Sequence, residues 1–227
     1  MSAKILFVHG SFMSGWCWLP VIERLEHLGI SCRALELPFT SLHDDVSYLR
    51  RQIDDATQHG AVTVVCHSYS GIATSMAAHH ADQLVYVAAR LPRPGESPVA
   101  LSEQWGTPAF RSCISTDPSG VSTLSPSAGP LLFHRSPTSM ALTAIERLRP
   151  MSSEIPVEPI DDPAWMVVPT TYVVCSDDRA VDVEQQRRRA ELTGRSVELD
   201  CDHSPFFSVP DQLTATLASV VDGVMTR

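Results

Sequence analysis

Short apolar runs alternate with segments of helical periodicity over most of the chain. Runs with the composition of buried strands span residues 4–10, 30–38, 61–68, 83–90, 170–176 and 195–201. Helical periodicity covers residues 18–29, 43–60, 69–80, 183–192 and 211–224. Because short, doubly apolar strands that alternate with helices build parallel sheets, the pattern predicts an α/β protein with a doubly wound, mostly parallel sheet of about six strands. Functional sites in such sheets lie at the carboxyl ends of the strands.

Residues 91–165 interrupt this alternation. The stretches "LPRPGESPVALSEQWGTP" and "SSEIPVEPIDDP" are rich in Pro, Ser and Gly, and the helical run "SMALTAIERLRP" lies between them. Since no strand period here is long enough for the main sheet, we interpret residues 91–165 as a helical lid insertion. The core domain then consists of residues 1–90 and 166–227.

The stretch "VVCHSYSGIA", residues 64–73, runs from a predicted strand directly into a helix, with Ser68 at the junction. A serine at such a sharp turn holds its hydroxyl out of the sheet on a strained backbone. Close crossing of the strand and helix requires small residues on either side, and Cys66 and Ser70 stand where glycine is usual. The alternative is that Ser68 only caps the helix. We expect His67 to pack away from the hydroxyl.

Two later segments supply the partners that a nucleophilic serine needs. A serine is a weak nucleophile at neutral pH, so it requires a base that is itself oriented by an acid. His203 in "DCDHSPFFSVPDQL" follows a strand, and Asp177 and Asp178 in "YVVCSDDRAV" follow the preceding strand. The order serine, acid, histidine is typical of one particular fold.

The loop "FVHGSFMSGWCW" after the first strand predicts an oxyanion hole. The backbone N–H of Ser11 or Phe12 and the N–H of Tyr69 would point at the same reacting carbonyl. The amino terminus of the helix that follows Ser68 adds a partial positive charge. His9 is expected to order this loop by hydrogen bonding, or else to be a core histidine.

Five segments together make the chain similar to the α/β-hydrolase superfamily, and within it to the small members related to plant methylesterases and hydroxynitrile lyases and to their bacterial counterparts. These segments extend from residue 8 to residue 213 and are "VHGSFMSGWCW", "VCHSYSG", "YVAARLPRPGESP", "YVVCSDDRAV" and "DHSPFFSVPDQL". The resemblance implies the α/β-hydrolase fold, with Ser68 as nucleophile, His203 as base and an aspartate near 178 as the orienting acid. The sequence departs from the family by lacking both glycines beside Ser68.

The family pattern of an aspartate, two further residues and a branched aliphatic residue selects between the two aspartates. It fits Asp178 and Val181, so Asp177 is expected to be a solvated neighbour. Asp182, with Gln185 three residues later, predicts a capping box for the next helix.

The favoured function is hydrolysis of a carboxylic ester through an acyl-enzyme, and a thioester or lactone would pass through the same intermediates. In the hydroxynitrile lyases that the chain resembles, activity depends on a lysine after the catalytic histidine and a threonine in the loop, where this chain has Ser204 and Gly10. Epoxide hydrolases and dehalogenases carry aspartate at the position of Ser68. A specialised biosynthetic catalyst for cyclisation, dehydration or lyase chemistry, and a ligand-binding relative, stay open as alternatives.

Aromatic residues in and near the insertion are candidates to line an apolar cavity, although each could equally form core: Trp105, Phe110, Phe133, Trp165 and Phe206. No basic cluster marks an acidic substrate, so we expect a small or medium-sized, largely apolar substrate.

The formal charge of −9 argues against a nucleic-acid or anionic-membrane partner. Six scattered cysteines without a CxxC pair, and His79 and His80 on different sides of a helix, give no sign of a metal site, and we expect no cofactor. The segment "MSAKILFVHG" lacks the features of a signal peptide, and no apolar stretch is long enough for a membrane span. We therefore expect a reduced, cytoplasmic setting and a small-molecule substrate; a homodimer is left open.

Overall fold

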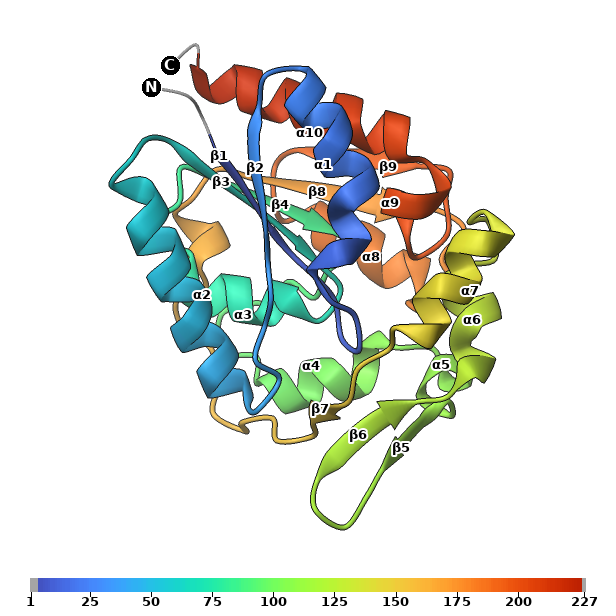
Figure 1. Ribbon diagram of the computed structural model, residues 1–227. Coiled ribbons are helices and arrows are strands. Elements are labelled where there is room, and N and C mark those ends of the chain that lie inside the picture. The colour runs from blue at the N-terminus through green and yellow to red at the C-terminus, as the bar shows by residue number, and fades with distance from the viewer. Residues whose placement is uncertain (1–3, 226–227) are drawn as a thin grey trace.

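The computed structural model describes residues 4–225, with side chains described through residue 221. A six-stranded parallel sheet forms the centre, with strand order β2-β1-β3-β4-β8-β9 (Figure 1). Its strands are β1 (Lys4–Val8), β2 (Ser31–Leu35), β3 (Val62–His67), β4 (Gln83–Val87), β8 (Thr170–Cys175) and β9 (Ser196–Leu199). The predicted doubly wound sheet is therefore confirmed. Residues 1–3 and 226–227 of the predicted core domain lie outside the described residues.

Burial along the strands explains the order of the sheet. The central strands β3, β4 and β8 are buried at every position, whereas the edge strands β2 and β9 expose alternate residues. The chain moves from β1 outward to β2 and then returns to place β3 on the other side of β1. This reversal creates a switch point between the carboxyl ends of β1 and β3, which is where ligands bind in open α/β sheets.

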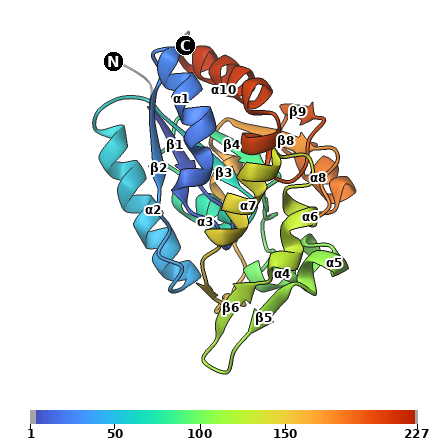
Figure 2. The same cartoon turned by 45° about the vertical axis from the view of Figure 1, so that its right-hand side comes forward.

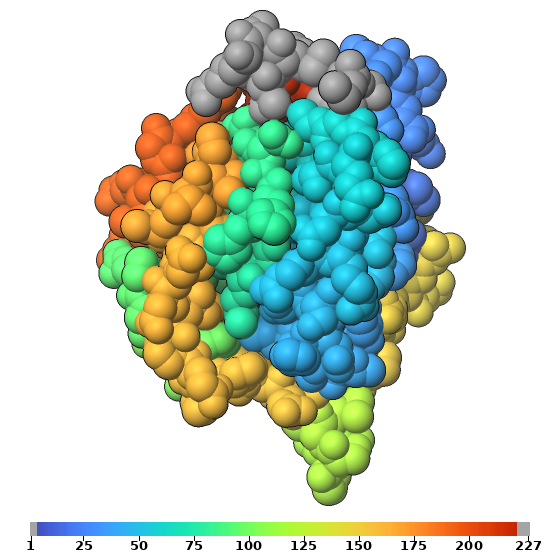
Figure 3. All heavy atoms as spheres, turned by 90° about the vertical axis from the view of Figure 1, so that its left-hand side faces the viewer, coloured from blue at the N-terminus to red at the C-terminus, as the bar shows by residue number. Residues whose placement is uncertain are grey.

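Helices cover both faces of the sheet. The helices α1 (Leu19–His27) and α10 (Pro210–Met225) pack together on one face, and α2 (Leu42–Thr57) and α3 (Ser70–Ala77) pack together on the other (Figures 1 and 3). Helix α8 (Val183–Ala190) packs against β8, and two short helical segments, η1 (Gly15–Trp18) and α9 (Pro205–Ser208), follow β1 and β9. Across the described part of the chain, every helix is too short or too polar to cross a bilayer.

The segment 91–165 contains the expected helices and, in addition, a small antiparallel sheet. The helical elements of this segment and its end are α4 (Pro98–Trp105), α5 (Pro108–Arg111), η2 (Pro126–Ala128), α6 (Gly129–Leu132), α7 (Thr138–Glu146) and η3 (Ala164–Met166). The small sheet consists of β5 (Ile114–Thr116), β6 (Val121–Leu124) and β7 (Met151–Ser152). The sequence predicted helices alone because strands of two to four residues are too short to produce a strand period. The segment lies beyond the carboxyl ends of the parallel strands, and its β5–β6 hairpin projects away from them (Figure 2).

Candidate active site

Ser68 lies at the tip of a sharp turn between β3 and α3. Its φ angle is +54°, in the left-handed region that residues other than glycine seldom adopt. The N–H of Ser68 donates to the carbonyl oxygen of Val87 at 3.2 Å, and the carbonyl oxygen of Ser68 accepts from the N–H of Arg90 at 2.9 Å. These hydrogen bonds, to the last residue of β4 and to the chain just after it, hold the strained turn in place.

Close packing around this turn explains its small residues. A Cβ atom at Gly71 would lie 2.2 Å from the carbonyl oxygen of Arg90, so only glycine fits there. Ser70 does more than provide a small side chain. Its hydroxyl accepts from the N–H of His67 at 3.0 Å and lies 3.1 Å from the carbonyl oxygen of Val8. This hydroxyl therefore ties the turn to β1, a role that reasoning from residue size alone did not predict.

His203 and Asp178 form a buried pair at the carboxyl ends of β9 and β8. The Nδ1 of His203 donates to the Oδ2 of Asp178 at 2.6 Å, and the two side chains are 4% and 0% exposed. The other carboxylate oxygen, Oδ1, accepts from the N–H groups of Ala180 at 2.8 Å and Val181 at 2.9 Å. The carboxylate is thus fixed in position. It keeps the proton of His203 on Nδ1, so Nε2 is unprotonated.

Gln186 on α8 completes the support of this carboxylate. Its Nε2 donates to the Oδ2 of Asp178 at 2.8 Å, while its Oε1 accepts from the N–H of Cys175 at 3.0 Å. The sequence analysis did not identify Gln186. A signal was present, because helical spacing from Val183 places residues 186 and 190 on the buried face.

The neighbouring aspartates have other roles. The carboxylate of Asp177 is 43% exposed and accepts from Nε2 of His134 at 3.0 Å, so it does not contact His203. Asp182 caps α8, with its Oδ1 accepting from the N–H of Gln185 at 2.9 Å. The Asp182 half of the predicted capping box is confirmed. The side chain of Gln185 does not close the box and instead donates to the carbonyl oxygen of Gln104 at 2.6 Å.

Ser68 and His203 line the same small cavity. Its walls also include Gly10, Ser11 and Phe133. A larger cavity of about 280 Å³ adjoins it and shares Ser11 with it. The other two residues predicted to form the oxyanion hole, Phe12 and Tyr69, line this larger cavity. Phe12 has a φ angle of +62°, so the loop after β1 is strained close to the Ser68 turn.

Comparison with known proteins agrees with this arrangement. A sequence model described as "Alpha/beta hydrolase family" matches residues 5–216. The chain belongs to the alpha/beta hydrolase family. "Probable hydrolase R7" of Phoma sp. is 28% identical to this hydrolase in an alignment that covers 95% of this chain and 97% of that protein. Methylesterase 1 of Arabidopsis thaliana is 24% identical in an alignment that covers 96% of this chain and 95% of the plant protein.

The fold of this hydrolase also matches solved structures. The crystal structure of polyneuridine aldehyde esterase superposes with a TM-score of 0.82 at 19% sequence identity, over 97% of this chain and 99% of that chain. The α/β-hydrolase fold and the predicted resemblance are confirmed. The chain is an esterase or hydrolase of this family.

His9 orders the loop after β1 in this hydrolase. Leu37 donates its N–H to Nε2 of His9 at 3.1 Å, so the proton lies on Nδ1, which donates to the carbonyl oxygen of Gly10 at 3.0 Å. Burial lowers the pKa of His9 to about 4, because the charged imidazolium is poorly solvated there. The ring is neutral at pH 7 and links the loop to the chain after β2, as one of the two sequence interpretations expected.

His67 lies closer to the site than expected. Its ring packs against His203 with 4.6 Å between centroids, and its Nε2 donates to the carbonyl oxygen of His203 at 2.8 Å. It also packs against Phe206 and lines the small cavity with Ser68. Burial, with a further contribution from His203, holds the pKa of His67 well below its ordinary value. The imidazole is a neutral donor that supports the histidine loop.

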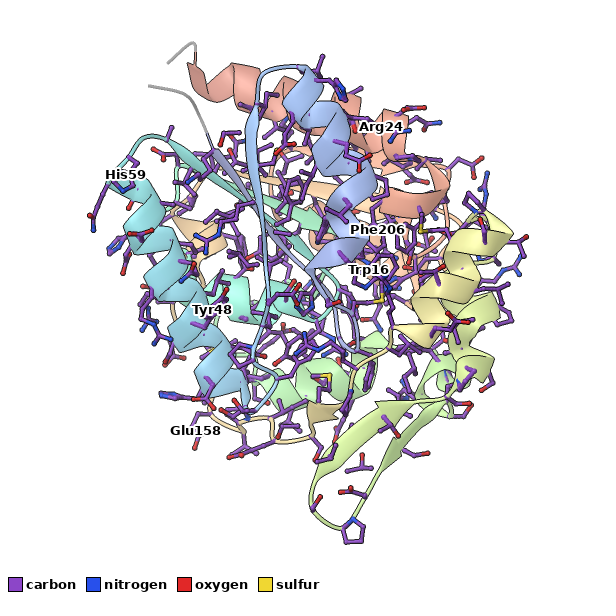
Figure 4. The ribbon with its side chains drawn as sticks, viewed as in Figure 1. Trp16, Arg24, Tyr48, His59, Glu158 and Phe206 are labelled. Atoms are coloured by element: carbon purple, nitrogen blue, oxygen red, sulfur yellow. The ribbon has the colours of Figure 1, made fainter. Side chains whose placement is uncertain are left out.

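The structure divides the predicted aromatic residues into two groups. Phe133 lines the small cavity and Phe110 lines both cavities. Phe206 is instead fully buried in the core, where its ring lies 5.0 Å from that of Trp18; Figure 4 labels it near the amino-terminal end of α1. Trp105 is fully buried, and Trp165 donates its Nε1–H to the carbonyl oxygen of Pro92 at 2.7 Å.

Trp105, Trp165 and Phe206 therefore lie outside the lining of both cavities among the described residues. Trp105 and Trp165 lie in the insertion, which needs buried aromatic side chains of its own to pack, whereas Phe206 on α9 packs against Trp18 and His67 of the core domain. The apolar lining of the larger cavity comes from Phe12, Val99, Phe110, Ile114, Met151 and Ile155.

Asp202 is a buried carboxylate next to His203 that the sequence analysis did not identify. Its Oδ2 accepts from the N–H of Arg135 in the insertion at 2.9 Å, and its Oδ1 accepts from the N–H of Ser204 at 3.1 Å and the hydroxyl of Ser208 at 2.7 Å. One fully buried side chain thus connects the insertion to the loop that carries His203. The only sequence signal was an acid directly before the histidine.

Proposed function

We propose that this hydrolase cleaves a carboxylic ester through an acyl-enzyme formed on Ser68. One observation carries the proposal. The buried pair of His203 and Asp178, joined at 2.6 Å, opens onto the same small cavity as a serine held at a φ of +54°. A serine, a histidine and an orienting acid in this arrangement activate a hydroxyl for attack on a carbonyl carbon.

The reaction follows from the hydrogen bonds. Asp178 keeps the proton of His203 on Nδ1, so Nε2 can accept the proton of Ser68 as its oxygen attacks the ester. The same nitrogen then protonates the departing alcohol. Water, deprotonated by His203, attacks the acyl-enzyme and releases the carboxylic acid and free Ser68.

Charge on the tetrahedral intermediate requires stabilisation. The proposal assigns this role to the backbone N–H groups of Tyr69, at the start of α3, and of Ser11 or Phe12, in the loop after β1. Tyr69 directly precedes α3, where the helix adds a partial positive charge. A donor of this kind lowers the activation barrier by on the order of 3 kcal/mol.

The cavities support a small to medium-sized ester. The larger cavity, of about 280 Å³, is mostly apolar, and Methylesterase 1 is among the relatives, so methyl esters are the first substrates to examine. Thioesters and lactones share the same intermediates. A hydroxynitrile lyase with threonine in the loop is disfavoured, because a Cβ atom at Gly10 would lie 2.7 Å from Nδ1 of His67.

The test is covalent labelling combined with turnover. A serine-directed fluorophosphonate should label the protein, and p-nitrophenyl acetate should be hydrolysed. Ser68→Ala and His203→Ala should each abolish turnover, and Ser68→Ala should also abolish labelling. Ser115→Ala, at an exposed serine on β5, serves as the matched control. Near-normal turnover in Ser68→Ala would refute the proposal, whereas labelling without turnover of any ester would favour a specialised non-hydrolytic reaction.

A further inference from the structure

Arg90 places a guanidinium group in the wall of the larger cavity. Its backbone N–H donates to the carbonyl oxygen of Ser68 at 2.9 Å, so the residue sits directly beside the Ser68 turn. Its side chain lines the cavity with Tyr69, and the guanidinium carbon lies 6.0 Å from the centre of that ring. One nitrogen, Nη1, donates to the hydroxyl of Ser102 on α4 at 3.0 Å. The group therefore lies between the turn and the insertion.

The charge of this guanidinium has no counter-ion among the described side chains. No carboxylate of residues 4–221 has an oxygen within 4.0 Å of its nitrogens. The Nε atom is buried without a hydrogen-bond partner, and it is the one such atom in the described residues that belongs to a permanently charged side chain. Burial lowers the pKa of Arg90 to about 10, which still leaves it charged at pH 7.

The other charged residues of the cavity do not neutralise Arg90. Glu103 and Arg111 also line the cavity, and both are exposed residues. The guanidinium of Arg111 donates to the backbone carbonyl oxygens of Glu103 at 3.0 Å and of Gly106. The cavity thus contains two guanidinium groups and one carboxylate, in walls that are otherwise mostly apolar.

Arg90 is a partly buried residue whose charge has no counter-ion in the described part of the chain, and this is unfavourable because the hydration that the group loses is not replaced by a partner. A structural role would need only the hydrogen bond to Ser102 and the contact with Tyr69, which an uncharged side chain could also provide. The ring of Tyr69 lies at the outer limit of a cation–π contact and so offsets little of the charge, and neither contact uses the buried Nε–H of Arg90. An anionic group in the cavity would use both, because a guanidinium binds a carboxylate through two parallel N–H donors.

We propose that the cavity binds an ester that also carries a carboxylate, and that Arg90 pairs with this carboxylate while the ester carbonyl lies at Ser68. The inference rests on the proposed esterase function and specifies its substrate class as half-esters of dicarboxylic acids with a short apolar chain between the two groups. Hydrolysis of such a methyl half-ester consumes one water and releases methanol, the dicarboxylate and one proton. The apolar walls of the cavity contact the hydrocarbon chain of the substrate, and the guanidinium of Arg90 contacts its carboxylate.

Pairs of substrates that differ only in charge test the proposal. Monomethyl and dimethyl adipate, pimelate and suberate carry the same leaving group, and methanol release measures kcat and KM for each. We expect the wild-type protein to prefer the half-ester of at least one chain length by roughly 10-fold or more in kcat/KM. Arg90→Met should raise KM for that half-ester by roughly 10- to 100-fold and change kcat/KM for the diester by less than about 3-fold.

Two further variants make the comparison specific. Arg90→Lys keeps the charge but loses the two-donor geometry, so it should restore part of the lost affinity. Arg93→Met removes the same charge from the same loop at an exposed residue outside the cavity lining, and it should leave both substrates unaffected. Equal losses in Arg90→Met and Arg93→Met would indicate a general effect of charge and would overturn the proposal.

Failure of the inference can be told apart from failure of the esterase function. Turnover of p-nitrophenyl acetate and fluorophosphonate labelling report the reaction alone. Binding of monomethyl pimelate to Ser68→Ala, measured by calorimetry with and without Arg90→Met, reports the subsite without turnover. Wild-type and Arg90→Met proteins that treat half-ester and diester alike would overturn the proposal. A lower melting temperature in Arg90→Met, with equal loss for both substrates, would assign Arg90 a structural role and overturn it as well.

Discussion

The hydrogen bonds around Asp178 predict the effect of Asp178→Asn in detail. Oδ1 accepts two backbone N–H groups, so the amide oxygen of the asparagine must take that position. Its Nδ2 then replaces Oδ2 and faces Nδ1 of His203 and Nε2 of Gln186. Gln186 cannot turn around, because its Oε1 accepts from the N–H of Cys175. The asparagine therefore forces the proton of His203 onto Nε2.

Asp178→Asn should lower both kcat and the free energy of unfolding. A histidine protonated on Nε2 cannot accept the proton of Ser68, and loss of kcat on the order of 10⁴-fold is expected for the wrong tautomer. The amide group of the introduced asparagine and that of Gln186 would face each other as donors. That buried mismatch should lower the free energy of unfolding by about 1–3 kcal/mol.

The assay is kcat for p-nitrophenyl acetate, together with thermal unfolding and circular dichroism to show that the variant is folded. Asp177→Asn is the matched control, because its carboxylate is half-exposed and contacts His134 instead of His203. The control should retain activity within about 2-fold, as expected for a surface change. If folded Asp178→Asn kept more than a tenth of the activity, the acid role of Asp178 would be refuted.

Three other changes test the surrounding structure. Gly71→Ala should prevent folding or abolish activity, as measured by soluble yield and turnover, since the added Cβ would lie 2.2 Å from the carbonyl oxygen of Arg90. Ser70→Ala leaves the N–H of His67 without its partner and should lower the unfolding free energy by about 1–3 kcal/mol in denaturant titrations. Because the folded-state pKa of His9 is about 4, below its ordinary value of 6.5, the unfolded chain gains the proton first on acidification. Stability should fall by about 1.4 kcal/mol per pH unit from this residue as pH drops from 6.5 to 4, and His9→Gln should remove this contribution.

Much of the fold could be predicted because the central strands are buried at every position and are mostly apolar. The predicted runs extend past the strand ends because the loops that follow the strands are buried beside the site. The run at 83–90 continues beyond β4, which ends at Val87, because Ala88 and Ala89 are also buried although Ala88 has a φ of +43°. Loops that are buried against the site have the composition of strands, so composition alone cannot locate where a strand ends.

Only some of the residues of the candidate site could be predicted from the sequence. Residues whose role follows from chain order and local spacing, such as Ser68, Asp178 and His203, could be selected from the sequence. Helical spacing indicates that Gln186 is buried, but the roles of Gln186 and Asp202 could not be predicted, because they depend on which elements meet in three dimensions. The sequence analysis placed Arg90 at the end of a predicted strand. Since a single arginine does not form a basic cluster, nothing in the sequence indicated a charged group in the substrate cavity.

The supporting residues of this site share one physical property that Arg90 lacks. His9, Ser70, Gln186 and Asp202 are buried polar side chains, and each has hydrogen-bond partners that include backbone groups of the loops around the site. Such fully paired groups fix positions, because every alternative arrangement leaves a buried donor or acceptor unpaired. Arg90 has a buried donor without a partner among the described residues and an unbalanced charge in the cavity wall, which is the arrangement that the proposed substrate carboxylate would complete. The supporting residues therefore account for how the site holds its geometry, and Arg90 is the position at which the choice of substrate is expected to be made.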